Sequence, residues 1–258
     1  MPASSRLQLL EADPDLARDL DEERALAATR RLVVPAIELR RGRWTPGDAV
    51  EPGAPMPFGL LVLDGLLVRE ATVGDNPCAE LIGPGDVLRH VEQPESDELL
   101  PRSVSWSVLA PARVALLNSA LIGAAMPWPE VLACLVDRAG RRADRLVVLQ
   151  AITHLTRVDD RLLALLWYLA ERWGRVVPDG VVLDLRLPHR TLAGMVGARR
   201  PSVTTALGQL INRGDLERRA DGAWILRSGP PERRETGSHL DASNGTGPYA
   251  IGRGSTSR

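Results

Sequence analysis

The stretch TLAGMVGARRPSVTTALGQLINRGDL, Thr191 to Leu216, decides the fold of the carboxy-terminal part of the chain. Its first apolar residues fall on one side of a short helix, and Gly197 can adopt the left-handed conformation that ends such a helix. A second helix begins at Arg200 and Pro201. Proline is tolerated there because backbone N–H groups in the first turn of a helix have no intrahelical acceptor. Two short helices joined by a tight, glycine-containing turn predict a helix-turn-helix.

A short β-hairpin is predicted to follow the second helix. Gly214 closes that helix, and the run LERRADGAWIL then reads as strand, Asp-Gly turn and strand. Arg218 and Arg219 precede the turn, so they are placed to touch a phosphate backbone. The pattern is that of a wing beside a helix-turn-helix.

The amino end of the second helix carries an unusual pair, Arg199 and Arg200. Cations there oppose the helix dipole, and no Ser, Thr, Asn or Asp occupies the capping position. A DNA major groove would compensate, because guanine presents O6 and N7 acceptors to an arginine. Ser202, Thr204 and Thr205 lie on the exposed side of the same helix and can reach phosphates or bases. A solvated arginine pair on a core helix is the alternative.

Charge is concentrated in this region. The 258 residues carry a net charge of −1, whereas Arg186 to Arg219 contains seven arginines and two acidic residues, a local charge of +5. A nucleic-acid surface must therefore be local if it exists.

The amino-terminal half has a different pattern. Short apolar runs separated by turn residues extend from Leu26 to about Leu117 and predict a β-barrel or sandwich. Asp64-Gly65 suggests a tight hairpin, and residues 83–86 (GPGD) suggest a second turn. Buried strands of an α/β fold are the alternative, but no helices alternate with these runs.

After Pro127 and Pro129 the apolar period becomes helical, and it predicts one long amphipathic helix. Its apolar positions are Leu132, Leu135, Ala139, Ala143, Leu146, Leu149 and Ile152. Arginines and one aspartate fill the other face. Such a helix commonly pairs with a copy of itself, although packing against its own domain explains the same stripe. A new helix is expected from Asp159 to Gly174, and a strand from Val181 to Leu187.

The run LAGMVGARRPSVTTALGQL, together with these elements, resembles the Crp/Fnr family of transcription regulators. The resemblance covers about Leu26 to Leu226 and implies an α+β fold with an amino-terminal double-stranded, jelly-roll-like β-roll, a long dimerisation helix and a winged helix-turn-helix. It divides the chain into an N-terminal helical segment (1–25), a β-roll sensor domain (26–128), a dimerisation helix (129–157), a winged helix-turn-helix (158–228) and a disordered tail (229–258).

The resemblance also implies which residues meet DNA. Arg200 corresponds to a base-reading arginine of the family, Pro201 replaces a usual glutamate, and Thr205 replaces a second base-reading arginine. The target sequence should therefore differ from the best-known family consensus. The full set of expected DNA contacts is Arg199, Arg200, Ser202, Thr204, Thr205, His189, Arg190, Arg218 and Arg219.

The expected effector site departs from the family pattern. Leu88-Arg89-His90 follows the GPGDV turn where the family has Gly-Glu, and Leu146 and Val147 stand where hydroxyl residues of the family meet adenine. These departures argue against cyclic AMP. Arg102 and Ser103 sit about where an Arg-Ser pair belongs, so an anionic ligand stays open, as does a plain surface arginine at a strand start. An unidentified small-molecule effector, or none, is the expectation.

No cofactor or metal is expected. Cys78 and Cys134 are too few for an iron–sulfur cluster, and nothing identifies His90 or His154 as a haem ligand. A cupin-like enzyme would need a histidine cluster, and only His90 lies within the roll. We therefore expect a cytoplasmic protein, neither an enzyme nor a membrane protein, with double-stranded DNA carrying a palindromic operator and a second copy of the chain as partners, and RNA polymerase as a further candidate. The alternative is an interaction module that binds protein rather than DNA.

Overall fold

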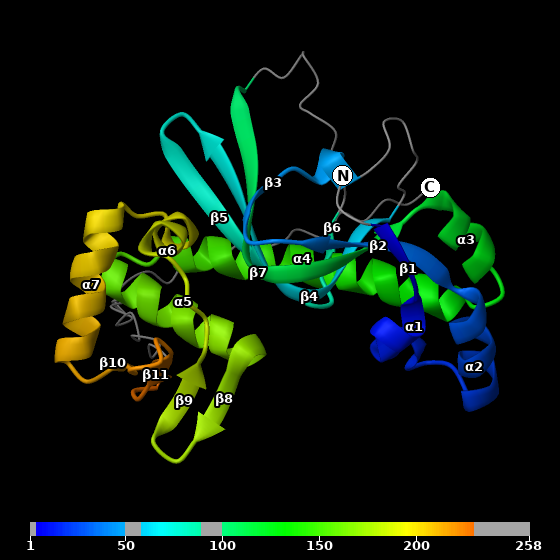
Figure 1. Ribbon diagram of the computed structural model, residues 1–258. Helices are drawn as coiled ribbons and strands as arrows, with labels where there is room; N and C mark the ends of the chain where they lie inside the picture. The colour runs from blue at the N-terminus through cyan, green and yellow to red at the C-terminus, as the bar shows by residue number, and fades with distance from the viewer. Residues whose placement is uncertain (1–3, 50–57, 89–99, 230–258) are drawn as a thin grey trace, which may run out of the picture.

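The computed structural model describes residues 4–49, 58–88 and 100–229. An antiparallel sheet fills the amino-terminal half, with strand order β1-β2-β7-β4-β5, while β3 pairs with β7 and β6 pairs with β4 (Figure 1). The strands are β1 (Ser4–Gln8), β2 (Val33–Leu39), β3 (Gly42–Trp44), β4 (Gly59–Val73), β5 (Asn76–Ile82), β6 (Val87–Leu88) and β7 (Arg102–Leu117). This mixed helix and antiparallel-sheet architecture confirms the predicted fold class.

The interior of the roll follows from apolar residues on its strands. Leu60, Val62 and Leu67 of β4 are fully buried and form one cluster with Ile82 of β5 and Val114 of β7. Burying such side chains is worth about 1.5–3 kcal/mol each, so the longest strands form the centre of the sheet.

The predicted hairpin at Asp64-Gly65 is wrong. Both residues lie inside the continuous strand β4, where the register against β7 shifts between Val62 and Leu67. Gly65 has φ +90°, and an added Cβ would collide with the carbonyl of Pro111. The Asp-Gly pair forms a bulge rather than a chain reversal, because both sides of it keep pairing with the same neighbour. The second predicted turn, Gly83 to Asp86, is present.

The first 25 residues are not wholly helical. Strand β1 pairs with β2, and it precedes α1 (Leu9–Ala12), the 3-10 turn η1 (Pro14–Ala17) and α2 (Glu22–Arg31). Helix α2 continues past the expected boundary at residue 25, and Asp21 caps its amino end. A further 3-10 turn, η2 (Pro46–Ala49), and helix α3 (Ser119–Ala125) flank the remaining strands.

The long helix α4 (Pro129–Thr153) runs alongside the whole roll and ends before the expected residue 157 (Figure 1). The division of α4 into a buried and an exposed face differs from the one that its sequence predicts. Leu135 and Ile152 are buried as expected, but Leu146 of the same stripe is exposed. Arg138, on the other face, is buried.

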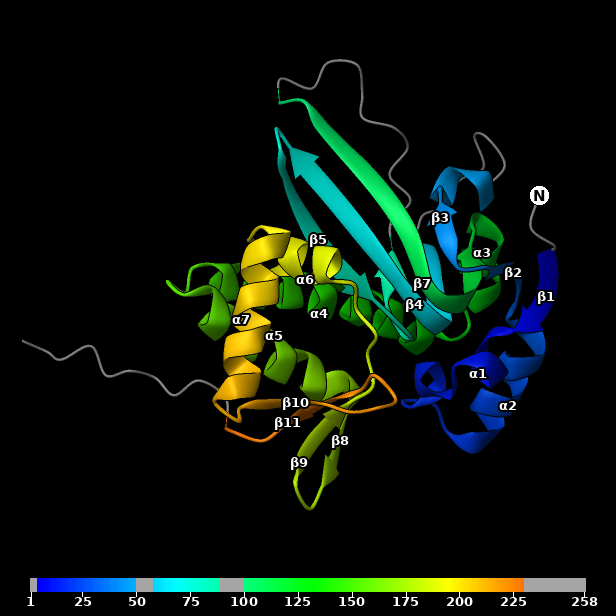
Figure 2. The same cartoon turned by 60° about the vertical axis from the view of Figure 1, so that its left-hand side comes forward.

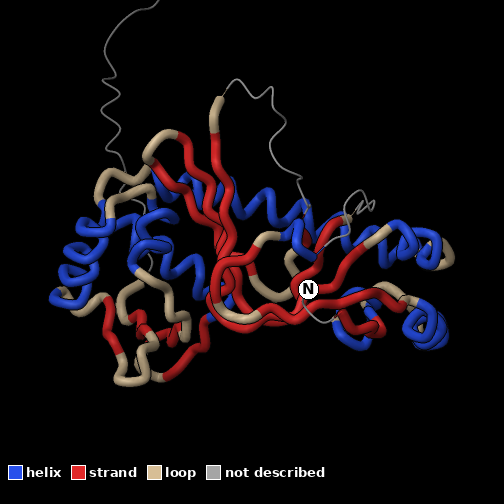
Figure 3. The backbone as a smooth tube through the Cα atoms, turned by 45° about the horizontal axis from the view of Figure 1, so that its top comes forward, coloured by secondary structure: helices blue, strands red, loops and turns tan. Residues whose placement is uncertain are grey.

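The carboxy-terminal unit combines three helices with a four-stranded sheet of order β10-β11-β9-β8. Figure 3 shows short strands in red next to the blue helices of this unit. Its elements are α5 (Val158–Trp173), β8 (Gly174–Val177), β9 (Gly180–Leu183), α6 (His189–Val196), α7 (Arg200–Asn212), β10 (Leu216–Arg218) and β11 (Trp224–Leu226). Strand β8 was not predicted, and β9 ends four residues before the expected Leu187. The expected disordered tail lies almost entirely outside the described residues.

Helix α6 lies directly against β5 of the roll (Figure 2). A Cβ added to Gly194 would stand 2.9 Å from the Cβ of Ala79, so glycine permits this approach. One apolar cluster contains Val68 and Leu81 of the roll together with Leu192 of α6. The winged unit and the roll therefore share a core.

Candidate nucleic-acid interface

The helix-turn-helix forms where the sequence predicts it. Gly197 takes the left-handed conformation (φ 60°, ψ 43°) that ends α6, and the N–H of Ala198 donates to the carbonyl of Ala193. Helix α7 begins three residues later and buries Val203, Ala206, Leu207 and Leu210. The opposite face of α7 is left to solvent.

The amino end of α7 has no side-chain cap. Arg199 occupies the capping position with extended backbone (φ −83°, ψ 146°), and Pro201 follows in the first turn. Arg199 and Arg200 are both exposed, and neither forms an ion pair with a carboxylate of the described residues. The positive charge at this helix end is thus unneutralised by that part of the protein.

The hydroxyl residues of α7 are exposed, and two of them bond to their own helix. The Thr204 hydroxyl donates to the Arg200 carbonyl over 3.1 Å, and that of Thr205 donates to the Pro201 carbonyl over 3.2 Å. The Nδ1 of His189 lies 3.0 Å from the Thr204 hydroxyl. Ser202 is exposed beside them. Five of the predicted contact residues thus gather at the first turns of α7, with His189 at their edge.

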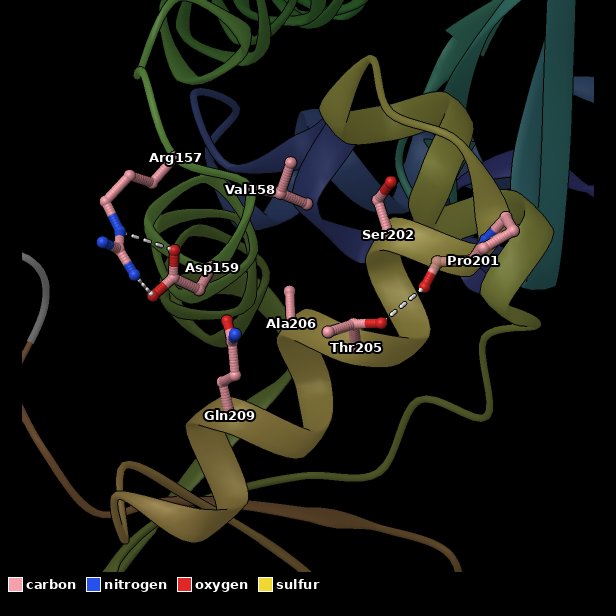
Figure 4. A pocket seen from close by; sticks show the side chains of 8 residues that line it. All are labelled: Arg157, Val158, Asp159, Pro201, Ser202, Thr205, Ala206 and Gln209. Carbon is pink, nitrogen blue, oxygen red and sulfur yellow. Dashed lines mark hydrogen bonds and ion pairs between the residues drawn. The ribbon is translucent and has the colours of Figure 1, made fainter.

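An open depression of about 470 Å³ lies between the start of α5 and the outer face of α7 (Figure 4). Its lining residues are Arg157, Val158, Asp159, Pro201, Ser202, Thr205, Ala206 and Gln209. Sequence reasoning missed Arg157 and Gln209. The one available signal was that Gln209 falls four residues after Thr205, and so on the same side of the helix.

Asp159 anchors the base of this depression. Its side chain is 4% exposed and accepts hydrogen bonds from Arg157 Nε at 3.0 Å and from Arg213 Nη1 at 2.6 Å. These bonds, with that of Arg157 the stronger influence, lower the pKa of Asp159 from 3.8 to about 2. Arg213 also bonds to Asp215 at 2.8 Å, so an arginine counted in the local positive charge is used within the fold.

The wing forms as predicted, and its arginines lie on its surface. The Arg218 guanidinium stacks 4.1 Å from the centre of the Trp224 ring, and Arg219 lies 3.3 Å from a carboxylate oxygen of Asp221. Gly222 takes φ +88° in the turn between β10 and β11. Both arginines are exposed, although each already has an interaction inside the wing.

Arg190, at the start of α6, has a partner in the roll. Its guanidinium lies 3.3 Å from the Glu70 carboxylate on β4, with the Arg190 side chain 72% exposed. An exposed pair of this kind is weak, about 0–1 kcal/mol. Arg190 is therefore available to a stronger anion.

The residues expected at an effector site are only partly within the described part of the chain. Arg102 and Ser103 are exposed at the first two positions of β7. A second cavity of about 410 Å³ lies elsewhere, between β5, α4, α5 and α6, and includes Leu146 and Tyr168 in its lining. Arg89 and His90 lie outside the described residues.

Two further observations concern the described ranges, 4–49, 58–88 and 100–229. Within them, no three His, Cys, Asp or Glu side chains are grouped so that they could hold a metal ion. In the same ranges, no helix has both the length and the apolar character needed to cross a bilayer.

Comparison with known proteins places this architecture. Residues 160–228 match the model of the Crp-like helix-turn-helix domain. The chain is 32% identical over 168 residues to the regulatory protein CysR of Synechococcus elongatus. The aligned region covers 62% of this chain and 72% of CysR.

Solved structures share the fold at low sequence identity. FixK2 from Bradyrhizobium japonicum is 19% identical, with a TM-score of 0.56, over 76% of this chain and 94% of its own. A cyclic nucleotide-binding domain containing protein from Listeria monocytogenes is 13% identical, with a TM-score of 0.58, over 85% of this chain and 98% of its own. The β-roll, long helix and winged unit are thus a shared architecture.

Proposed function

Because the chain belongs to the Crp/Fnr family of transcription regulators, we propose that it is a dimer that reads a palindromic DNA operator with α7. The observation that carries this proposal is the pair Arg199 and Arg200, exposed at a helix end that lacks any cap. A guanine edge in the major groove offers two acceptors to such an arginine, and the surrounding phosphates supply negative charge.

The residues proposed to contact the DNA phosphate backbone surround this helix end. Ser202 and Thr204 lie on the exposed side of α7, while His189 and Arg190 begin α6. Arg218 and Arg219 extend the surface to the wing. Arg157, at the start of α5, adds a cation on the other side of the depression. Phosphate contacts of this kind fix the register of the protein on the duplex, and base contacts then specify the sequence.

The dimer is proposed through α4. Val136 and Val147 are 59% and 65% exposed, Leu146 is 39% exposed, and the small residues Ala139 and Ala143 lie exposed between them. These positions recur every three or four residues and form one apolar stripe that a second α4 would cover. Two recognition helices about 34 Å apart would then meet successive major grooves.

The remaining parts of the proposal concern regulation. Leu146 and Val147 carry no hydrogen-bonding group, which supports an effector other than cyclic AMP, or none. Arg102 and Ser103 are kept as the candidate anion contacts of the roll. RNA polymerase is proposed as a further partner at promoters, and the cytoplasm as the place of action. The family is one of transcription regulators, so we propose no enzymatic activity.

The test is duplex binding by fluorescence anisotropy, after selection of bound fragments from random DNA. Arg199→Ala with Arg200→Ala should weaken specific binding by about two orders of magnitude or more, since each base contact is worth about 1–3 kcal/mol. The double variant should also reduce the slope of log affinity against log salt.

The matched control is Arg40→Ala with Arg41→Ala, which removes an adjacent exposed arginine pair from the roll. It changes the net charge equally and should leave specific binding within about twofold. If wild-type binding is weak and insensitive to salt from the outset, the protein-interaction alternative replaces this proposal. A monomer at working concentration would overturn the dimer.

A further inference from the structure

We infer that Thr205 reads thymine through its methyl group, so the operator half-site carries a thymine whose 5-methyl packs against the second turn of α7. This inference rests on the proposed function, because it concerns how the same helix selects its DNA. It assigns a specificity to a position that in the family holds a base-reading arginine.

The Thr205 side chain carries a hydroxyl and a methyl group, and the hydroxyl is hydrogen-bonded within the helix. The hydroxyl donates to the Pro201 carbonyl over 3.2 Å, so its single proton points back along the helix. The methyl carbon points the other way, toward the open depression (Figure 4). Thr205 is exposed, so this methyl is available to a partner.

Pro201 lies one helical turn before Thr205, on the same side of α7. Its ring carries no N–H, and its carbonyl already accepts the Thr205 hydroxyl. The two positions that hold a carboxylate and a guanidinium in the family therefore offer no free hydrogen-bond donor here. Their outward surface is a pyrrolidine ring and a methyl group.

Among the base edges of the major groove, thymine alone carries an apolar group, the 5-methyl. A methyl surface placed where a base is read therefore favours thymine over cytosine, adenine and guanine. Arg200 precedes Thr205 by more than one turn and keeps its guanine contact, so the two readings fall on different base pairs. The half-site should combine a guanine with a thymine.

The rival reading uses the Thr205 oxygen as an acceptor for an exocyclic amine. Its lone pairs are not consumed by the bond to Pro201, and the N4 amine of cytosine or the N6 amine of adenine could donate to them. The two readings predict different responses to a change that removes only a methyl group from the DNA.

The experiment replaces thymine by deoxyuridine, one position at a time, in the selected half-site. At one thymine the substitution should weaken wild-type binding about three- to fivefold, the effect of losing one buried methyl. Thr205→Ser, which keeps the hydroxyl and loses the methyl, should bind the thymine site as weakly as wild type binds the uracil site and should no longer distinguish them. Thr205→Val, which keeps a methyl and loses the hydroxyl, should retain the discrimination.

Thr204→Ser is the matched control, because its hydroxyl bonds to the helix in the same way. It should leave the wild-type ratio of thymine to uracil affinity unchanged. If no thymine responds to uracil while salt-dependent specific binding persists, the inference fails and the proposed function stands. Loss of discrimination in Thr205→Val, or a preference for cytosine over thymine and 5-methylcytosine, would assign the reading to the hydroxyl. If no specific duplex binding occurs at all, both proposals fail.

Discussion

Four arginines of α4 and α5 and the two at the start of α7 are the same residue type in opposite surroundings. The first group faces carboxylates of the amino-terminal half, in the pairs Arg138–Asp13, Arg142–Glu80, Arg145–Asp86 and Arg172–Asp86. Arg199 and Arg200 face solvent, with no carboxylate partner in the part of the chain that the structure describes. The first group connects the amino-terminal half to the two helices, whereas the second makes no such connection within the described residues.

The comparison shows that a count of charges does not identify a binding surface. The local charge of +5 around α7 includes Arg213, which two carboxylates neutralise, and Arg190, which faces Glu70. Arg199 and Arg200 differ from Arg190 and Arg213 in having no such partner within the described residues. Three measurements test this division.

The largest change in the free energy of unfolding is expected on removing Asp86, the carboxylate that two arginines of the first group share. Asp86 is 2% exposed and accepts from Arg145, from Arg172 at 2.9 Å and from the N–H of Gly83 at 2.8 Å. Asp86→Ala leaves two arginines and a buried N–H without their acceptor, so the free energy of unfolding should fall by about 3 kcal/mol. Urea denaturation measures this.

Asp137→Ala is the control for that measurement. Asp137 pairs with Arg141 at 2.9 Å and with Arg18 at 3.4 Å, but its side chain is 48% exposed, so its loss should cost less than about 1 kcal/mol. Equal costs for the two variants would show that burial does not distinguish these arginines.

Acid should reveal the contribution of Asp159. Its pKa is about 2 in the folded protein against an ordinary 3.8, so its stabilising effect is complete well above pH 3.8 and disappears as the pH falls toward 2. The expected loss is about 1–2 kcal/mol, because the partner arginines are partly solvated. Asp159→Asn should be less stable at pH 7 and should show a flatter pH dependence between pH 5 and 2. Parallel curves for the two proteins would contradict this assignment.

The smallest effect is expected at the cap of α7, and its sign is opposite. Arg199→Ser supplies the missing cap and removes an unfavourable cation, so it should raise the free energy of unfolding by about 0.5–1 kcal/mol. The same variant should weaken duplex binding. Thermal denaturation with and without DNA separates the two changes, and a destabilised variant would show that Arg199 supports the fold instead.

The sequence predicts the parts of this molecule that depend on neighbouring residues. The end of α6 at Gly197, the start of α7 at Pro201 and the wing follow from local conformational preferences, and the structure has all three. The exposure of Arg199 and Arg200 follows from the apolar stripe on the opposite side of the same helix.

Features that depend on distant partners were not predicted. Nothing near Arg138 in the sequence shows that Asp13 will meet it, so its burial could not be read from the helical pattern of α4. The bulge at Gly65 looks like a hairpin signal because both need a positive φ, and only pairing along the full length of β7 separates them. The sequence near Gly194 likewise does not show that Ala79 of β5 packs against it.

The contact between Gly194 and Ala79 couples the position of the roll to the position of the helix-turn-helix. Because α6 and β5 belong to one core, a displacement of β5 carries α6 with it, and α7 follows through the short turn at Gly197. In a dimer, the separation of the two reading helices would then depend on the position of the β4–β5 hairpin as well as on the coiling of α4. A larger side chain at residue 194 would push α6 away from β5 and so change that separation, although residue 194 is itself buried.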